Sequence, residues 1–159
     1  MLKQRIYIET TLFNFYFDTD RGILYEATVQ LFKEIAAGKY EAYTSTYVID
    51  ELKNAPEEKR DKMLALLAEY DIAVFDKSDE AERFANMYVS EGIIPAKYRT
   101  DGLHIAVAAI KGLDMIVSLN FQHIVKPKTR MGTAGININY GCKPIQIYSP
   151  MEVIENEEI

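Results

Sequence analysis

Four oxygen-bearing side chains stand at the ends of apolar runs in this chain. Glu9 and Asn120 each close a short run of strand-forming residues. Glu51 lies in a helix-like stretch that follows another strand, and Asp101 opens a further helix-like segment. Carboxylates gathered in one place repel each other unless a cation lies among them. Because such oxygens suit Mg²⁺ or Mn²⁺, these residue types indicate phosphoryl-transfer or phosphodiester chemistry.

The four side chains can meet only if the elements that carry them share one edge of a sheet. Apolar and β-branched runs predict strands at residues 4–9, 40–44, 71–75, 115–119 and 145–148. Helical spacing of apolar residues predicts helices at residues 23–37, 46–55, 57–69, 79–91 and 101–111. This alternation is typical of an α/β protein with a parallel sheet and helices on both faces. The carboxyl ends of its strands would lie along one edge.

Two other segments have weaker patterns. Residues 10–17 predict a short aromatic helix or turn. We expect the aromatic side chains of this segment to pack in the core or in a dimer interface, with base stacking as the alternative. They are Phe13, Phe15, Tyr16 and Phe17. Residues 126–141 are rich in Gly, Asn and Lys and are predicted to be the least regular part of the chain.

Length and composition favour a single domain without a membrane segment. We expect the domain to span residues 1–154 of the 159, followed by a frayed acidic tail at 155–159. The longest apolar runs are far short of the roughly 20 residues that cross a bilayer. The N-terminal segment has no apolar signal region, and the lone Cys142 cannot form an internal disulfide. These features predict a soluble cytoplasmic protein.

Charge is unevenly distributed along the chain. The net charge is -6, which argues mildly against a general nucleic-acid binder. Between Lys97 and Lys143, however, seven basic residues stand against two acidic ones, a net charge of +5. Asp101 and Asn120 lie in this basic stretch. A positive field around them would favour a phosphate backbone, although a solvated surface of varying charge is the alternative.

The order of these residues resembles a known family, the PIN domain of VapC-type toxins from bacterial and archaeal toxin–antitoxin systems. Its first two motifs match residues 7–11 (Tyr-Ile-Glu-Thr-Thr) and residues 45–52 (Ser-Thr-Tyr-Val-Ile-Asp-Glu-Leu). The third motif, an Asp that opens an Ala-rich helix, matches residues 101–109. The fourth matches residues 118–124 (Ser-Leu-Asn-Phe-Gln-His-Ile), in the branch that reads Asn-Phe-x-His-Ile. The resemblance covers nearly the whole chain.

The resemblance implies a three-layer α/β/α fold with a central, mostly parallel sheet of four to five strands. It also implies a metal-dependent endoribonuclease that acts as a toxin, binds a cognate antitoxin and forms a homodimer. Glu9, Glu51 and Asp101 would hold one or two Mg²⁺ or Mn²⁺ ions, with Asn120 as a further ligand or as a residue that orients one. The metal would polarise a phosphate oxygen and activate water for attack on RNA.

Other residues would support this site. Thr11 and Ser118 would fix a carboxylate or a water by hydrogen bonding. Five basic side chains are candidates to hold the RNA backbone without reading its sequence. They are Lys97, Arg99, Lys126, Lys128 and Arg130.

Two residues depart from the family pattern and leave an alternative open. Most members have Asp where this chain has Glu9, and many have Asp where it has Asn120. A longer arm displaces a metal, and an amide removes a charge, so both changes are expected to reduce the rate. The alternatives are a PIN-like module that binds RNA or protein without cutting, and a phosphoryl-accepting receiver domain with an acidic Mg²⁺ site.

The two histidines allow two interpretations. His104 follows Asp101 by three residues, and His123 follows Asn120 by three, so on helices each pair would share a face. They would then be metal ligands or a general base. We favour local hydrogen bonding or packing for both, because chemistry with a hard metal needs no imidazole.

Overall fold

A sheet of five parallel strands forms the centre of the structure, a computed structural model that describes residues 2–155. The strands are β1 (Gln4–Ile8), β2 (Tyr40–Ser45), β3 (Ala73–Phe75), β4 (Met115–Val117) and β5 (Gln146–Tyr148). Their order in the sheet is β3-β2-β1-β4-β5. This confirms the predicted parallel sheet. The receiver alternative is wrong, because that doubly wound fold has the order 2-1-3-4-5.

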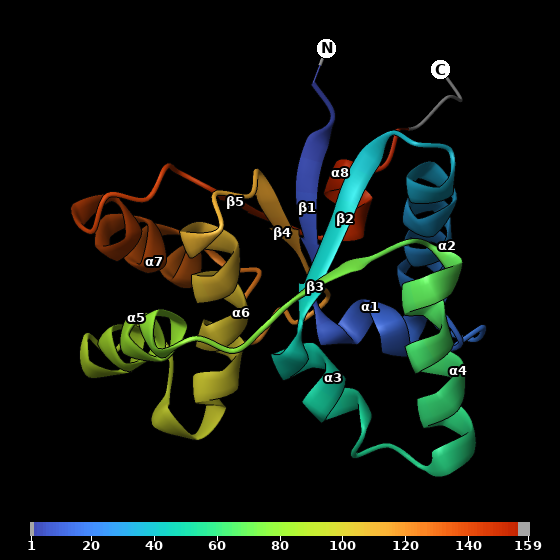
Figure 1. Ribbon diagram of the computed structural model, residues 1–159, viewed down its shortest axis with the longest axis horizontal. Coiled ribbons are helices and arrows are strands. Elements are labelled where there is room, and N and C mark those ends of the chain that lie inside the picture. Colours follow the sequence, from blue (N-terminus) through green and yellow to red (C-terminus); the bar gives the residue numbers. More distant parts are fainter. Residues whose placement is uncertain (1, 156–159) are drawn as a thin grey trace.

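Helices cover the sheet on both sides and give three layers (Figure 1). Helices α5, α6 and α7 pack together on one side, and α2 packs with α8 on the other, while α1, α3 and α4 contact one another. The helices are α1 (Thr10–Phe15), α2 (Ile23–Ala36), α3 (Thr46–Leu52), α4 (Glu57–Glu69), α5 (Asp79–Ser90), α6 (Arg99–Ile110), α7 (Pro127–Asn139) and α8 (Pro150–Val153), with a 3-10 turn, η1 (Ala96–Tyr98), before α6. None of these helices is long and apolar enough to span a membrane.

The central strand β1 sets the position of the candidate site. The chain passes from β1 to β2 and β3 on one side, then crosses to β4 and β5 on the other. The strand order therefore reverses at β1, and in such sheets ligands bind beyond the carboxyl ends of the strands at this point. Ile8 pairs with Val117, and the amide of Glu9 donates to the carbonyl of Val117 at 3.2 Å. The residues that follow β1 and β4 therefore emerge side by side.

Helix α6 is buried almost all round. Nine consecutive residues, from Asp101 to Ala109, are buried between neighbouring elements. Gly102 permits this close packing, since a Cβ there would lie 3.1 Å from Cδ2 of Tyr88 and 3.3 Å from Cδ1 of Ile94. The helix begins at Arg99, so Asp101 lies in its first turn and is not the residue that caps it. The small residues of α6 thus bring its first turn against α5.

The prediction of an irregular segment at residues 126–141 is wrong, because most of it forms α7. Pro127 occupies the first turn, where its missing N–H costs nothing. Gly132 packs so tightly that a Cβ would lie 2.6 Å from Cγ1 of Ile93. The buried Asn137 accepts a hydrogen bond from Tyr88 on α5. Tertiary packing therefore overrides the low helix propensity of this glycine-containing segment.

Other expectations hold with shifted boundaries. The strands expected at 71–75 and 115–119 are shorter, at Ala73–Phe75 and Met115–Val117. Residues 10–15 of the aromatic segment form α1, and the segment packs in the core as one of the alternatives proposed: Phe13 is fully buried against Phe32. Of the expected acidic tail, residues 156–159 lie outside the described residues, and a single domain over 1–154 stays a prediction.

Candidate active site

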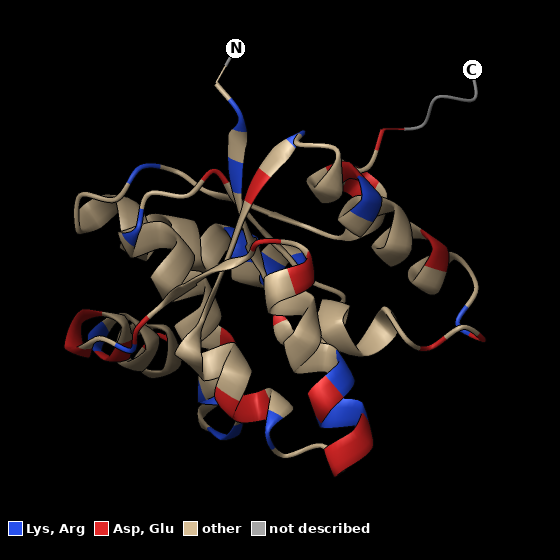
Figure 2. Cartoon of the chain, turned by 45° about the vertical axis from the view of Figure 1, so that its right-hand side comes forward, with Lys and Arg blue, Asp and Glu red and all other residues tan. Residues whose placement is uncertain are grey.

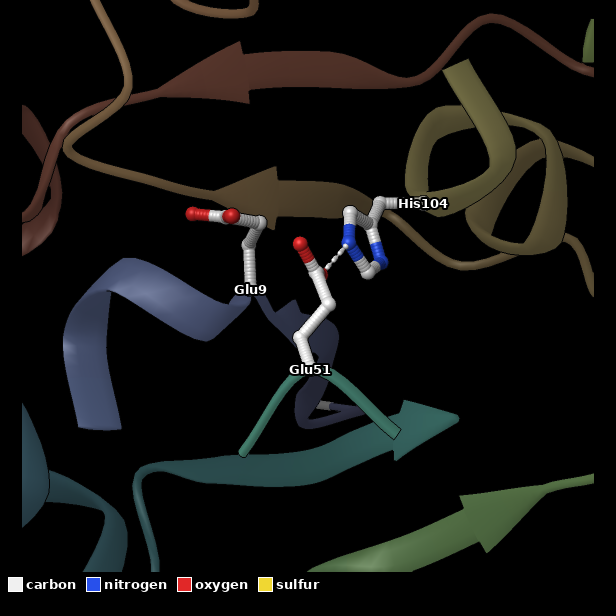
Figure 3. Close-up of side chains that lie close together, drawn as sticks. All are labelled: Glu9, Glu51 and His104. Carbon is white, nitrogen blue, oxygen red and sulfur yellow. Dashed lines mark hydrogen bonds and ion pairs between the residues drawn. The ribbon is translucent and has the colours of Figure 1, made fainter. Parts of the chain in front are cut away.

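Glu9, Glu51 and His104 form a tight group at the carboxyl edge of the sheet. One potential ligand atom from each lies within 4.8 Å of the other two. Glu9 directly follows β1, Glu51 comes from α3, which follows β2, and His104 comes from the second turn of α6. Figure 3 shows the Glu51 carboxylate between Glu9 and the His104 ring. The fold thus brings together two of the predicted acids and one of the two histidines.

Glu9 is held by hydrogen bonds to one of its carboxylate oxygens. Its Oε1 accepts from the amide of Thr11 at 3.1 Å, from the Thr11 hydroxyl at 2.6 Å and from the Ser118 hydroxyl at 2.7 Å. The residue is 2% exposed and caps α1. Within residues 2–155 no donor is found on Oε2 of Glu9. One oxygen is therefore fixed by the protein, and the other is left for a ligand.

Thr11 and Ser118 also link the ends of β1 and β4. The amide of Leu119 donates to the Thr11 hydroxyl at 2.8 Å, and the amide of Asn120 donates to the Ser118 hydroxyl at 2.9 Å. Each hydroxyl thus accepts from a backbone amide and donates to Glu9. Both hydroxyls therefore hold a carboxylate, and their support of a metal site stays a prediction.

Glu51 shares the same pattern of one fixed and one open oxygen. Its Oε1 accepts from the Thr10 hydroxyl at 2.6 Å and from Nε2 of His104 at 2.6 Å. Burial opposes ionisation of Glu51, but hydrogen bonds from His104 and Thr10 and the charge of His104 outweigh it and lower the pKa of Glu51. Its carboxylate form is therefore favoured. Among the described side chains, none donates to Oε2 of Glu51.

A buried chain of hydrogen bonds supports His104 from below. The Tyr7 hydroxyl lies 2.8 Å from Nδ1 of His104 and 2.6 Å from the Ser45 hydroxyl. Both rings are completely buried. Burial lowers the pKa of His104, but the contact with Glu51 and the charges of Glu9 and Asp101 raise it above the ordinary value overall. The ring can therefore hold a second proton and offset part of the negative charge.

Sequence reasoning missed Tyr7, Ser45 and Thr10, and placed His104 among residues that bond locally. A usable signal existed for Tyr7, because it stands two residues before Glu9 on an extended segment, and alternate residues share a face. For His104 the signal was its place one turn after Asp101. The favoured expectation of local bonding is wrong for His104, because its partners, Glu51 and Tyr7, lie 53 and 97 residues away in the sequence.

Asp101 lies beside the tight group without belonging to it. Burial and the charge of Glu9 raise its pKa to about 6, against the opposing effects of His104 and of a hydrogen bond from Asn120. Oδ1 of Asn120 accepts from the amide of His123 at 3.0 Å. The oxygen of Asn120 is thus used within its own loop.

The five predicted RNA-binding cations divide into two kinds. Arg99 donates to Glu82 at 2.8 Å and to Asn86 at 2.6 Å, so it fastens α6 to α5. Arg130 donates to the carbonyl of Ile147 at 3.1 Å and to Glu152 at 3.3 Å. Figure 2 shows acidic and basic residues interspersed along the same helices. The two arginines therefore have structural partners.

The three lysines differ from the arginines. No ion pair involves Lys97, Lys126 or Lys128 in the part of the chain that the structure describes. Lys97 and Lys128 are exposed, and Lys126 precedes the first residue of α7. They are the members of the predicted set that remain available to a phosphate.

Comparison with family models and with curated proteins finds no match. Among solved structures, a chain of the crystal structure of VapBC2 from Rickettsia felis, bound to a DNA fragment from their promoter, is similar to this chain. The TM-score is 0.52 at 16% identity, and the match covers 75% of this chain and 90% of that one. At this level of identity the likeness concerns the fold. It agrees with the predicted PIN-like three-layer α/β/α architecture, which is the fold of this protein.

Proposed function

We propose that this protein is a metal-dependent endoribonuclease and the toxin of a toxin–antitoxin pair. The observation that carries the proposal is the pair of carboxylates, Glu9 and Glu51, each with one oxygen fixed by the protein and one left open at the switch point of the sheet. The fold likeness to a chain of VapBC2 supports it.

The donor set fits a hard divalent cation. Glu9 and Glu51 would hold Mg²⁺ or Mn²⁺ through their open oxygens, with Asp101 as the third acid. Burial and the charges of Glu9 and Glu51 raise the pKa of Asp101, and a cation beside it would relieve this repulsion. When bound, the cation would supply an electrophile for phosphate oxygens and would acidify water.

The protein's own residues would then orient the carboxylates and neutralise part of the charge of the RNA phosphates. Thr11 and Ser118 keep Oε1 of Glu9 occupied, so that Oε2 faces the ligand. His104 and Tyr7 fix the rotamer of Glu51 in the same way. Asn120 would hold Asp101 in place by hydrogen bonding. Lys97, Lys126 and Lys128 would attract the phosphates of RNA to the edge of the sheet.

An antitoxin protein and a second copy of the chain are the proposed partners. The support for an antitoxin is the name of the similar structure, VapBC2 bound to promoter DNA. The homodimer rests on the family resemblance of the sequence. Sedimentation of the purified chain, alone and with the product of an adjacent small gene, tests both partners.

The activity is tested by incubating a mixed RNA pool with Mg²⁺ or Mn²⁺, with EDTA as the control. Wild type should cleave only with metal, and Glu51→Gln and Asp101→Asn should lose at least a hundredfold in rate. Asp50→Asn is the matched control, because Asp50 is the partly exposed neighbour of Glu51 and pairs with Lys77. Cleavage that survives in Glu51→Gln, or that is lost equally in Asp50→Asn, would contradict the assigned site.

A binding module without cleavage is the second candidate. The observation that favours it is the orientation of Asn120, whose oxygen already accepts a hydrogen bond from the backbone amide of His123. Binding of RNA that stays intact after long incubation with Mn²⁺, without stabilisation of the protein by Mn²⁺, would support this candidate over the nuclease.

A further inference from the structure

Two aromatic rings are stacked at the rim of the candidate active site. The ring centroids of Tyr98 and His123 are 4.0 Å apart, with an angle of 25° between the planes. Tyr98 ends the 3-10 turn before α6, and His123 lies in the loop between β4 and α7. Tyr98 is 40% exposed, so the stack is not part of the core.

The loop holds the His123 ring by its backbone and by this stacking. The amide of His123 donates to Oδ1 of Asn120 at 3.0 Å, and its carbonyl accepts from the Thr129 hydroxyl at 2.8 Å. Its Nδ1 is buried and has no hydrogen-bond partner within the described residues. No side-chain hydrogen bond through Nδ1 therefore fixes the ring, and its face on Tyr98 is what positions it.

Both rings are close in sequence to residues of the acidic edge, that is, the carboxyl edge of the sheet with Glu9, Glu51 and Asp101. Tyr98 stands three residues before Asp101, and His123 stands three residues after Asn120, whose Oδ1 accepts from the amide of His123. Phe121, next to Asn120, is a further exposed ring, with 46% of its surface open. Aromatic surface therefore borders the place where the proposed function puts the scissile phosphate.

Cations accompany these rings. Nζ of Lys97 lies 5.7 Å from the centroid of Tyr98. The charge of Lys126 acts on the His123 ring. A flat aromatic face flanked by ammonium groups complements a nucleotide, which joins a planar base to an anionic phosphate. An apolar peptide side chain would gain nothing from the two lysines.

We propose that the Tyr98–His123 stack is the subsite for one unpaired base of single-stranded RNA, with Lys97 and Lys126 on the neighbouring phosphates. This inference rests on the proposed ribonuclease function and names the form of its substrate. Stacking accepts any base, because every base has a π face, so the subsite selects unpaired nucleotides rather than a sequence. Bases stacked within a duplex do not present a free face to it.

The test is fluorescence anisotropy with a labelled single-stranded 2′-O-methyl oligonucleotide in Mg²⁺, checked on a gel to be intact. In a series of such oligonucleotides, one nucleotide lacks its base, and its position along the strand differs from one oligonucleotide to the next. Tyr98→Leu should weaken binding of the intact strand roughly 5- to 100-fold. One abasic position should weaken binding of wild type to the same extent and should have no further effect on Tyr98→Leu, since both changes remove the same contact.

Two variants serve as controls. Tyr98→Phe keeps the ring and should bind as wild type does. Tyr140→Leu removes an exposed tyrosine, 63% open, that contacts Phe84 on α5 and lies outside the site; it should leave affinity unchanged. Circular dichroism of each variant establishes that it is folded.

Three results would overturn the subsite: no binding by wild type, unchanged affinity in Tyr98→Leu, or an equal loss for intact and abasic strands. Cleavage of the RNA pool is scored separately. Base-dependent binding without cleavage by wild type would overturn the nuclease and leave the subsite standing, whereas cleavage without base dependence would do the reverse.

Discussion

Nε2 of His104 lies 2.6 Å from Oε1 of Glu51, so the acidic edge of the sheet includes one side chain that can carry a positive charge. The same ring contacts the Tyr7 hydroxyl through Nδ1. His104 is thus tied to β1 and to α3 at once. It both orients an acid and reduces the repulsion among three.

Replacing this ring should cost stability. In His104→Ala the buried Tyr7 hydroxyl loses a partner and a cavity opens, so we expect a loss of about 2–4 kcal/mol in the free energy of unfolding. Urea denaturation at neutral pH measures it. His123→Ala, at a partly exposed position, should cost less than about 1 kcal/mol. Equal losses in the two variants would contradict the structural role assigned to His104.

Removing the Tyr7 hydroxyl tests the buried hydrogen-bond chain. Tyr7→Phe leaves Ser45 and Nδ1 of His104 without their shared partner, and we expect a loss of about 1–3 kcal/mol. Tyr16→Phe is the control, because the Tyr16 hydroxyl bonds to that of Tyr70 in a less buried place. Chemical denaturation of both variants should show the larger loss for Tyr7→Phe.

The raised pKa of Asp101 predicts an unusual dependence of stability on pH. Its folded-state pKa of about 6 lies above the ordinary value of 3.8. The protonated form is thus bound more tightly in the folded state, and this contribution is full below about pH 4 and is lost as pH rises through 6. Asp101→Asn should therefore be more stable than wild type at pH 8, by on the order of 2 kcal/mol, and similar at pH 3.5.

Glu51 has the opposite sign, because its folded-state pKa is lowered. Its contribution is present above the ordinary value of 4.5 and is lost as pH falls. Glu51→Gln should therefore be less stable than wild type at pH 8, in contrast to Asp101→Asn. Denaturation of the two variants across pH 3.5–8 distinguishes the acids. A parallel pH response in both would contradict the assigned shifts.

Metal should stabilise the protein through its open oxygens. At a hundred times its dissociation constant, Mn²⁺ should add about 2.7 kcal/mol to the free energy of unfolding, seen as a rise in Tm. Glu9→Gln should abolish the rise, and Asp50→Asn should retain it. A rise of equal size in Glu9→Gln would place the metal elsewhere.

The glutamate at position 9 is expected to suit its surroundings better than the aspartate usual in the resembling family. Its Oε1 reaches Ser118 as well as Thr11, and an arm shorter by one methylene cannot keep all three hydrogen bonds. Glu9→Asp should therefore weaken Mn²⁺ binding rather than improve it, as isothermal titration would show. Tighter binding in Glu9→Asp would mean that the longer arm is a defect.

The predictable part of the fold was the part with strong local patterns. Alternating strands and helices predicted the parallel sheet and the shared edge at which β1 and β4 end. Helix α7 was not predicted, because its stability comes from contacts between segments distant in the sequence, such as that of Gly132 with Ile93. Local composition contains no information on such a contact.

Only the part of the candidate site that has a local pattern could likewise be predicted from the sequence. Glu9 was marked by its place at the end of a strand, and Glu51 by its place in the helix that follows the next strand, because both positions lie at the carboxyl edge of the sheet. Tyr7 resembles any core aromatic residue on a buried strand, and its role depends on a ring from α6, 97 positions further on. Whether Arg99 is available or paired likewise depends on Glu82, which lies on another helix.

The pairing of β1 with β4 has a consequence for biosynthesis. Glu9 is made early, whereas Ser118, which holds its carboxylate, is 109 residues further along the chain. A nascent polypeptide that has not yet released β4 from the ribosome cannot assemble the acidic edge. The acidic edge therefore forms only after most of the chain has been synthesised.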